Sequence, residues 1–197
     1  FPDQLVTRTG WIENDLAEDK TKTFRLGGSL HYFINDRTEA VAQANYSQGN
    51  SVYTAQNRFS AREFNILTGK LEINNPNYYV RVWGVTENSG NSYDIGGAAL
   101  LMNEDWKPSA QWFQDYLTAY TQTALISGNM SNAHQFARLV SDNRDPKTGV
   151  VFDTSKPAFP VYGTPEFSQS LNKITSASLA NGGAMVFDNS KMTQFEG

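Results

Sequence analysis

Residues 23–34 read TFRLGGSLHYFI, and this stretch decides the fold class. Even-numbered positions carry apolar residues such as Leu26 and Leu30, whereas odd-numbered positions include Arg25 and His31. Successive side chains of a β-strand point to opposite sides of a sheet, so this alternation predicts a strand with one apolar and one polar face. The next residues, NDRT at 35–38, are typical of a tight turn, because Asn and Asp tolerate left-handed backbone geometry.

Three more strands are expected on the same reasoning. They cover residues 39–47, 62–73 and 78–86, and a second tight turn, NNPN, lies at residues 74–77. Residues 48–60 are polar and contain Gly49, so we expect a long loop between the second and third strands. The sequence thus predicts a mainly β chain with about four antiparallel strands, in which short turns alternate with a long loop.

Apolar residues change to helical spacing in the second half of the chain. We expect three helices, near residues 108–128, 131–146 and 164–183. Pro108 suits the opening of the first helix and Gly128 its end, while Ser131 is expected to cap the second. The Gly182-Gly183 pair is expected to end the third. Residues 87–94 are loop-like, and periodicity indicates no regular strand after them.

The change from alternating to helical spacing of apolar residues divides the chain into three parts. We expect residues 1–21 to be an extracellular loop or lead-in, and residues 22–94 to hold the strands and turns. Residues 95–197 are expected to be a large, partly helical insertion that returns to the sheet. Alternation alone fits a soluble antiparallel sheet as well as part of a transmembrane β-barrel. Short turns on one side and long connections on the other favour the barrel, because outer-membrane barrels have this asymmetry.

Aromatic residues gather beside both tight turns. Tyr32 and Phe33 precede the first turn, and Tyr78 and Tyr79 follow the second. They fit the aromatic girdle that marks a membrane interface, and they equally fit cross-strand pairs in the core of a soluble sheet. The pattern of these residues therefore leaves both interpretations open.

The composition narrows the functional classes. Of 197 residues, 18% are charged, the net charge is -4, and Cys is absent. An acidic chain is not expected to bind nucleic acid, and the lack of Cys removes disulfides, thiolate metal sites and thiol nucleophiles. No apolar run is long enough for a membrane-spanning helix, whereas spanning strands give a much weaker signal and are not excluded.

One long pattern runs through almost the whole chain. It consists of Arg8–Gly10, Gly28–Tyr32, Lys70–Ile73, Tyr78–Trp83 and Glu87–Asp94, followed by Ala133–Arg138 and Phe187–Gly197. This pattern resembles the barrel region of large TonB-dependent receptors, most closely those with an amino-terminal carboxypeptidase-regulatory-like domain. It is a long pattern and contains no catalytic signature.

The resemblance implies active uptake of a nutrient ligand across the bacterial outer membrane. The ligand would bind from outside, and the TonB energy-transducing system would act on a plug inside the barrel to open a path. The implied partners are that plug, the remainder of the same barrel and the lipid bilayer, and the insertion could bind substrate or a surface lipoprotein. Transporters of this class close with about 22 strands, so we expect the chain to be an internal fragment of a longer polypeptide.

A set of polar residues is expected to face the lumen or a ligand. All lie on the polar side of the expected strands, which would face the water-filled interior of a barrel. They are Arg25, His31, Lys70, Glu72 and Arg81. Polar side chains are normal inside barrels and also pair with a plug, so ligand contact and structural pairing both stay open.

Catalysis, a cofactor and a metal site are not expected. His31 and His134 are the only histidines and lie far apart in the sequence, and acidic pairs such as Asp36 with Glu39, or Asp142 with Asp145, lie in polar turns. The aromatic residues at 112–120 could stack on a sugar or peptide, but helical spacing favours packing against a neighbouring helix. The alternatives are a soluble all-β carbohydrate-binding module and a fragment of a polysaccharide-degrading enzyme.

Overall fold

The computed structural model describes residues 5–17, 20–145, 147–176, 187–188 and 190–196. These residues fold into two compact units. The helical unit lies within residues 1–16 and 96–177, and the sheet unit lies within residues 17–95 and 178–197. In chain order, the larger part of the helical unit is therefore inserted between strands of the sheet unit.

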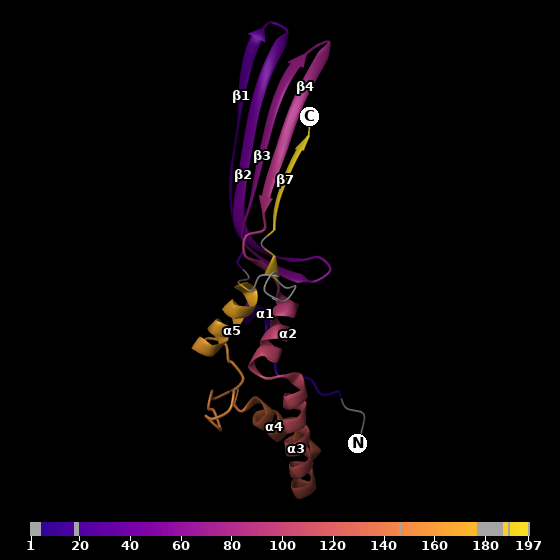
Figure 1. Ribbon diagram of the computed structural model, residues 1–197, viewed down its shortest axis with the longest axis vertical. Coiled ribbons are helices and arrows are strands. Elements are labelled where there is room, and N and C mark those ends of the chain that lie inside the picture. Colours follow the sequence, from indigo (N-terminus) through magenta and orange to yellow (C-terminus); the bar gives the residue numbers. More distant parts are fainter. Residues whose placement is uncertain (1–4, 18–19, 146, 177–186, 189, 197) are drawn as a thin grey trace. The chain divides into compact units, whose positions relative to one another are not determined.

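The sheet unit is built from long antiparallel strands (Figure 1). The main strands lie in the order β1-β2-β3-β4-β7, while β5 pairs with β3 and β6. Their bounds are β1 (Lys22–Asn35), β2 (Thr38–Thr54), β3 (Arg58–Asn75), β4 (Tyr78–Asn88), β5 (Ser92–Asp94), β6 (Phe187–Asp188) and β7 (Lys191–Glu196). The predicted mainly β, antiparallel architecture is confirmed. Among the described strands the sheet is open, with β1 and β7 at the ends of the main order.

Tight turns join β1 to β2 and β3 to β4, as the sequence predicts. Asn35 Oδ1 accepts a hydrogen bond from the Arg37 N–H at 3.0 Å. Asn75 Oδ1 accepts one from the Asn77 N–H at 3.0 Å. An Asn side chain therefore satisfies a backbone donor in each turn, which is the local reason that Asn opens both of them.

The expected long loop at residues 48–60 is wrong. Both β2 and β3 extend into this stretch, and only residues 55–57 connect them. Polar side chains do not prevent a strand here, because pairing uses backbone groups and because Tyr53 stacks on its cross-strand partner Phe59 at a centroid distance of 5.5 Å. Among the connections between main strands, the long one is therefore the insertion between β4 and β7.

Periodicity indicated neither of the two short strands that follow β4 and pair with long strands. β5 pairs with β3, and β7 pairs with β4 from Trp83 opposite Glu196 to Asn88 opposite Lys191. Strands this short contain too few alternating positions to be recognised from sequence. β7 nevertheless brings the chain back to the sheet as the direct neighbour of β4.

The helical unit contains the three expected helices and one unexpected long helix. The bounds are α1 (Glu13–Leu16), α2 (Ile95–Trp106), α3 (Ser109–Ser127), α4 (Met130–Asp142) and α5 (Pro165–Ser176). The sequence did not indicate α2, whose first turn holds Gly96 and Gly97, both poor helix formers. No helix in the described part of the chain has both the length and the apolar character needed to cross a membrane.

The helix ends agree only partly with the sequence signals. α3 ends at Gly128, which has a φ of 64° as expected for a left-handed cap. Ser131 does not cap α4, because Asn129 occupies that position and accepts a hydrogen bond from the Asn132 N–H at 3.1 Å. The predicted end at Gly182-Gly183 lies outside the described residues.

Three of the four aromatic residues of α3 lie in the core of the helical unit, as their spacing predicts, whereas Phe113 is exposed. Trp112, Tyr116 and Tyr120 are buried against Ala133 and Ala137 of α4. The rings of Trp112 and Tyr116 stack at a centroid distance of 5.3 Å. The small Ala side chains allow α4 to approach the line of rings closely, so this helix pair is held by dense packing.

Candidate functional site

Strand register places the apolar residues in rows on one side of the sheet, which we call the apolar face. Directly paired residues in neighbouring strands share a face, so each row crosses from β1 to β4. The rows are Leu26, Tyr46, Leu67 and Thr86; Gly28, Ala44, Gly69 and Gly84; Leu30, Ala42, Leu71 and Val82; and Tyr32, Ala40, Ile73 and Val80. The predicted alternation is therefore continuous across four strands.

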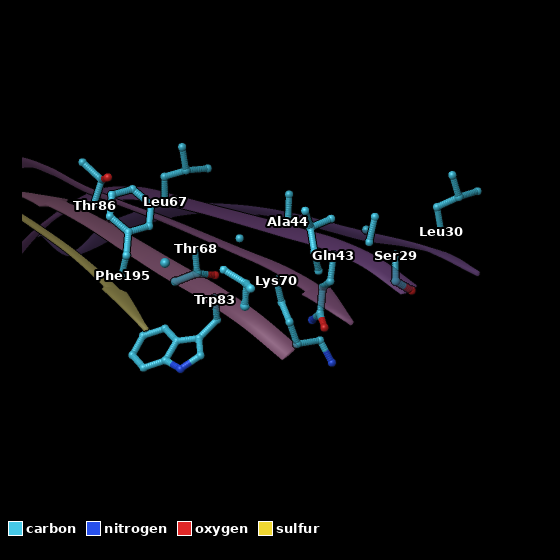
Figure 2. A pocket seen from close by; sticks show the side chains of 16 residues that line it. Ser29, Leu30, Gln43, Ala44, Leu67, Thr68, Lys70, Trp83, Thr86 and Phe195 are labelled. Carbon is cyan, nitrogen blue, oxygen red and sulfur yellow. The ribbon is translucent and has the colours of Figure 1, made fainter. Parts of the chain in front are cut away.

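The apolar face is uncovered. Leu30 is 71% exposed and Leu71 is 63% exposed, although both are large apolar side chains. Figure 2 shows Leu30 and Leu67 on one side of the sheet and Lys70 on the other. A soluble sheet would bury such a row against a second layer, and the described residues provide no such layer for these side chains.

The length of the apolar face fits a membrane. On β1 it extends from Phe24 to Tyr32, which is about 26 Å at about 3.3 Å per residue. A tilted membrane-spanning strand needs about 9–11 residues, and β1 has 14. Exposed Tyr32 and Tyr78 lie at the turn end of this face, where a girdle residue would meet the membrane interface.

A hollow of about 740 Å³ crosses the apolar face. Its floor is the row of Gly28, Ala44, Gly69 and Gly84, in which the only side chain is the methyl group of Ala44. Nothing lies within 4 Å of a Cβ placed on Gly28 or Gly69, whereas the ring of Phe195 lies over Gly84. The missing side chain on β4 thus lets β7 place an aromatic ring against the backbone of its neighbour.

The predicted site residues all lie on the opposite side, the polar face. His31 pairs with Val41, which in turn pairs with Glu72, and Glu72 pairs with Arg81. Lys70 lies on the same face of β3, two residues before Glu72. The structure therefore brings Lys70, Glu72 and Arg81 together, while Arg25 lies further along β1.

Glu72 is the centre of an ionic cluster. Its carboxylate accepts a hydrogen bond from Arg81 Nε and one from Asn74 Nδ2 at 2.6 Å, and Lys70 Nζ lies 3.5 Å from it. The Glu72 side chain is only 8% exposed, so an unpaired charge here would be costly. The two cations and the amide satisfy that carboxylate, and the cluster joins β3 to β4.

His31 has a separate partner. Its Nδ1 lies 2.7 Å from Glu39 Oε1 across the β1–β2 hairpin. The sequence had suggested Glu39 only as a partner of Asp36 in the turn. Neither Glu39 nor Asn74 was a predicted site residue, and only the register of the strands reveals their contacts.

These contacts make the polar face a charged, hydrogen-bonding surface. The Glu72 carboxylate is paired with both Arg81 and Lys70, and the three side chains together keep one net positive charge. His31 is on β1, whereas His134 is on α4 in the other unit. Among the described residues, no group of three or more His, Asp or Glu side chains is placed to hold a metal ion.

Comparison with known proteins assigns no family. No family model matches the chain. No curated protein and no solved structure match it either. Its function is therefore inferred from the chemistry of the two faces of the sheet and from the sequence resemblance.

Proposed function

We propose that the sheet is part of the wall of a transmembrane β-barrel, in a TonB-dependent receptor that imports a nutrient ligand across the bacterial outer membrane. The observation that carries this proposal is the uncovered apolar face, which is continuous over four strands and backed by a polar face. In a barrel wall the apolar face contacts lipid and the polar face lines the interior.

Water is an unfavourable environment for this face. Large contiguous apolar patches are rare on soluble monomers, because each exposed aliphatic side chain forfeits about 1.5–3 kcal/mol of burial energy. Leu26, Leu30 and Leu71 are each more than half exposed. Lipid tails would cover these side chains without any second protein layer.

The edge strands β1 and β7 need hydrogen-bonding partners if the sheet lies in a membrane. Backbone groups that stay unpaired in hydrocarbon cost several kcal/mol each, so a sheet in a bilayer must close on itself. The proposal therefore requires strand partners for the edges of β1 and β7 that no described strand covers, and further strands of the same receptor would supply them. The polar face, with Lys70, Glu72 and Arg81, would meet the plug or the passing ligand.

Adjacent single-Cys variants test the proposal, because none of these 197 residues is a Cys that would compete for the label. Ser29→Cys and Leu30→Cys each receive a nitroxide label in the intact protein within its cell envelope. We expect the label at position 30 to collide readily with oxygen dissolved in lipid, and the label at position 29 to collide with a water-soluble relaxation agent. Electron paramagnetic resonance saturation measures both collision rates.

Other outcomes identify other architectures. A soluble carbohydrate-binding module whose Leu30 packs against a second layer would protect position 30 from both agents. A sheet that faces water on both sides would expose both positions to the water-soluble agent. Either result would overturn the proposed barrel wall.

A further inference from the structure

The helical unit contains a groove that the proposed transport function does not use. It has a volume of about 650 Å³ and lies along α3, α4 and the segment after α4. We call it the α3–α4 groove. All of its lining residues belong to the helical unit, between Lys107 and Pro157.

One wall of the α3–α4 groove is polar. Gln111, Asp115, Thr118 and Gln122 line it at intervals of one helical turn along α3. The stripe from Gln111 to Gln122 is about 16 Å long at about 1.5 Å per residue. Amide side chains both donate and accept hydrogen bonds, so this wall can satisfy a row of hydroxyl groups.

The other wall is apolar. Phe136 and Val140 of α4 line it one turn apart, together with Phe152 from the segment that follows. Phe136 is 50% exposed and Phe152 is 56% exposed. Half-exposed aromatic rings in a groove offer flat faces on which a ligand can stack. Trp112 and Tyr116 do not, because they are buried in the core of the helical unit.

The segment that carries Phe152 is held in place by Asn143. The Asn143 side-chain amide donates to the carbonyl oxygens of Asp153, at 2.6 Å, and of Lys156, at 3.2 Å. Its own oxygen accepts from the Asp153 N–H at 2.9 Å. This bonding fixes the apolar wall relative to the end of α4, so the groove is formed before any ligand enters.

The charges in the groove are paired. Lys107 Nζ lies 2.7 Å from Asp115 Oδ2 and also donates to the Ser141 carbonyl oxygen at 2.7 Å. Lys156 Nζ lies 3.4 Å from Asp153 Oδ2. A site whose cations and carboxylates compensate one another favours an uncharged ligand over a phosphate, a carboxylate or a polycation.

The dimensions argue against a peptide. A helical peptide about 10 Å wide would occupy on the order of 1,200 Å³ over a length of about 16 Å, so the groove of about 650 Å³ would hold only part of it. A peptide strand binds by adding to a free sheet edge. The walls here are helices, whose interior backbone groups are already paired.

We propose that the α3–α4 groove binds a short, uncharged oligosaccharide. A sugar ring has apolar C–H faces, which stack on Phe136 and Phe152, and peripheral hydroxyl groups, which bond to the Gln111 and Gln122 amides. This inference does not rest on the proposed transport function, because the groove lies wholly within the helical unit.

Isothermal titration of the intact, purified protein with cellotetraose, maltotetraose and xylotetraose tests the inference. We expect at least one of these sugars to bind with one site per chain. Gln122→Ala and Phe136→Ala should each weaken that binding about tenfold, the effect of losing about 1.4 kcal/mol of contact. Gln114→Ala is the matched control, since it makes the same change on α3 outside the groove lining and should leave the affinity unchanged.

The inference is overturned if none of the three sugars binds. It is equally overturned if Gln122→Ala and Phe136→Ala bind as the wild type does, because the sugar would then sit elsewhere. Competition by an uncharged tetrapeptide with the same sensitivity to both variants would assign the groove to peptides instead. Far-ultraviolet circular dichroism confirms that each variant keeps its helices, and the nitroxide experiment tests the barrel wall separately.

Discussion

Asp142 shows how a single residue joins distant parts of the helical unit. Its side chain is buried at the end of α4, where it accepts hydrogen bonds from Trp112 Nε1 at 2.8 Å and from Thr9 Oγ1. Burial raises the pKa of this carboxyl above its usual value, and the hydrogen bonds from Thr9 and Trp112 oppose that rise. The folded protein therefore holds the Asp142 proton more tightly than the unfolded chain does.

This difference predicts the sign of a pH dependence. The contribution of Asp142 to the free energy of unfolding falls as pH rises from the ordinary Asp value of 3.8 through the raised pKa. Asp142→Asn removes this titration, so its free energy of unfolding relative to wild type should increase between about pH 3 and pH 7. Denaturant unfolding followed by Trp fluorescence at several pH values measures the difference.

Other carboxyls in the same unit have lowered pKa values, so their effect on the free energy of unfolding changes with pH in the opposite direction. Hydrogen bonds from Ser109 lower the pKa of Glu104, and the Lys147 backbone N–H lowers the pKa of Asp145. The stabilisation that Glu104 and Asp145 provide is lost as pH falls. It is the same in wild type and in Asp142→Asn, so it cancels in the difference between their free energies of unfolding. A difference between Asp142→Asn and wild type that does not change with pH would contradict the assigned role of Asp142.

The sequence alone does not predict the hydrogen-bond partners of Asp142. Asp142 stood out only as one half of an acidic pair with Asp145, in what looked like a polar turn. Its partners Thr9 and Trp112 lie far away in the chain. Such a hydrogen-bonded site depends on tertiary packing, which local patterns do not encode.

At the scale of elements, strong local signals predicted the structure well. The turns of β1–β2 and β3–β4 and the Gly128 end of α3 are all set by the conformational preferences of one or two residues. The extension of β2 and β3 through residues 48–60 was missed, because backbone pairing there outweighs a polar composition. The sequence did not predict α2, because the two glycines in its first turn are poor helix formers. The helix is stabilised instead by tertiary packing of Ala98 and Met102, which are buried.

The end of α3 provides a clean test of a backbone effect. Gly128 has a φ of 64°, and nothing lies within 4 Å of a Cβ placed on it. Gly128→Ala should therefore lower the free energy of unfolding by about 1–2 kcal/mol through left-handed strain alone. Thermal unfolding monitored by circular dichroism measures the change.

Gly10→Ala is the control for that substitution. Gly10 also has open space around its Cβ position, but no left-handed φ. Its replacement should be neutral or slightly stabilising, because Ala reduces the freedom of the unfolded chain. Equal destabilisation by both variants would show that the effect at Gly128 does not come from backbone geometry.

At the scale of the whole molecule, the alternation of faces was the most informative sequence feature. The alternation alone predicts that five polar residues lie on one side of the sheet, and the strand register agrees. These residues are Arg25, His31, Lys70, Glu72 and Arg81. The ionic contacts of Glu72 with its neighbours could not be derived in the same way. They depend on which residues of β3 and β4 stand opposite each other, and a shift of one residue would move every side chain to the other face.

The two faces should respond differently to an added charge. On the lipid side of a barrel, an Arg costs about 2–4 kcal/mol at the middle of the membrane and less toward its interfaces, whereas on the interior side it is tolerated. The proposed barrel wall predicts that Leu71→Arg reduces the amount of folded protein in the outer-membrane fraction several-fold. Gln43→Arg, on the polar face of β2, should leave that amount close to wild type, as measured by quantitative immunoblotting.

The effect of Leu71→Arg can be interpreted simply, because no second layer of described residues packs on Leu71. Leu71 is already 63% exposed, so loss of buried contacts among the described residues would not explain a defect. Equal accumulation of the two variants would contradict a lipid-facing role for Leu71.

The pairing of β5 with β6, and of β4 with β7, has a consequence for how such proteins diversify. The chain leaves the sheet and returns to it at paired strands, with Tyr93 opposite Phe187 and Asn88 opposite Lys191. A segment whose two ends are already clamped together can be shortened, lengthened or exchanged with little additional loop-closure entropy. The inserted part of the helical unit, within residues 96–177, can therefore be exchanged while the strands keep their register, provided that the replacement also accommodates the residues before β1, such as Thr9, that pack on it.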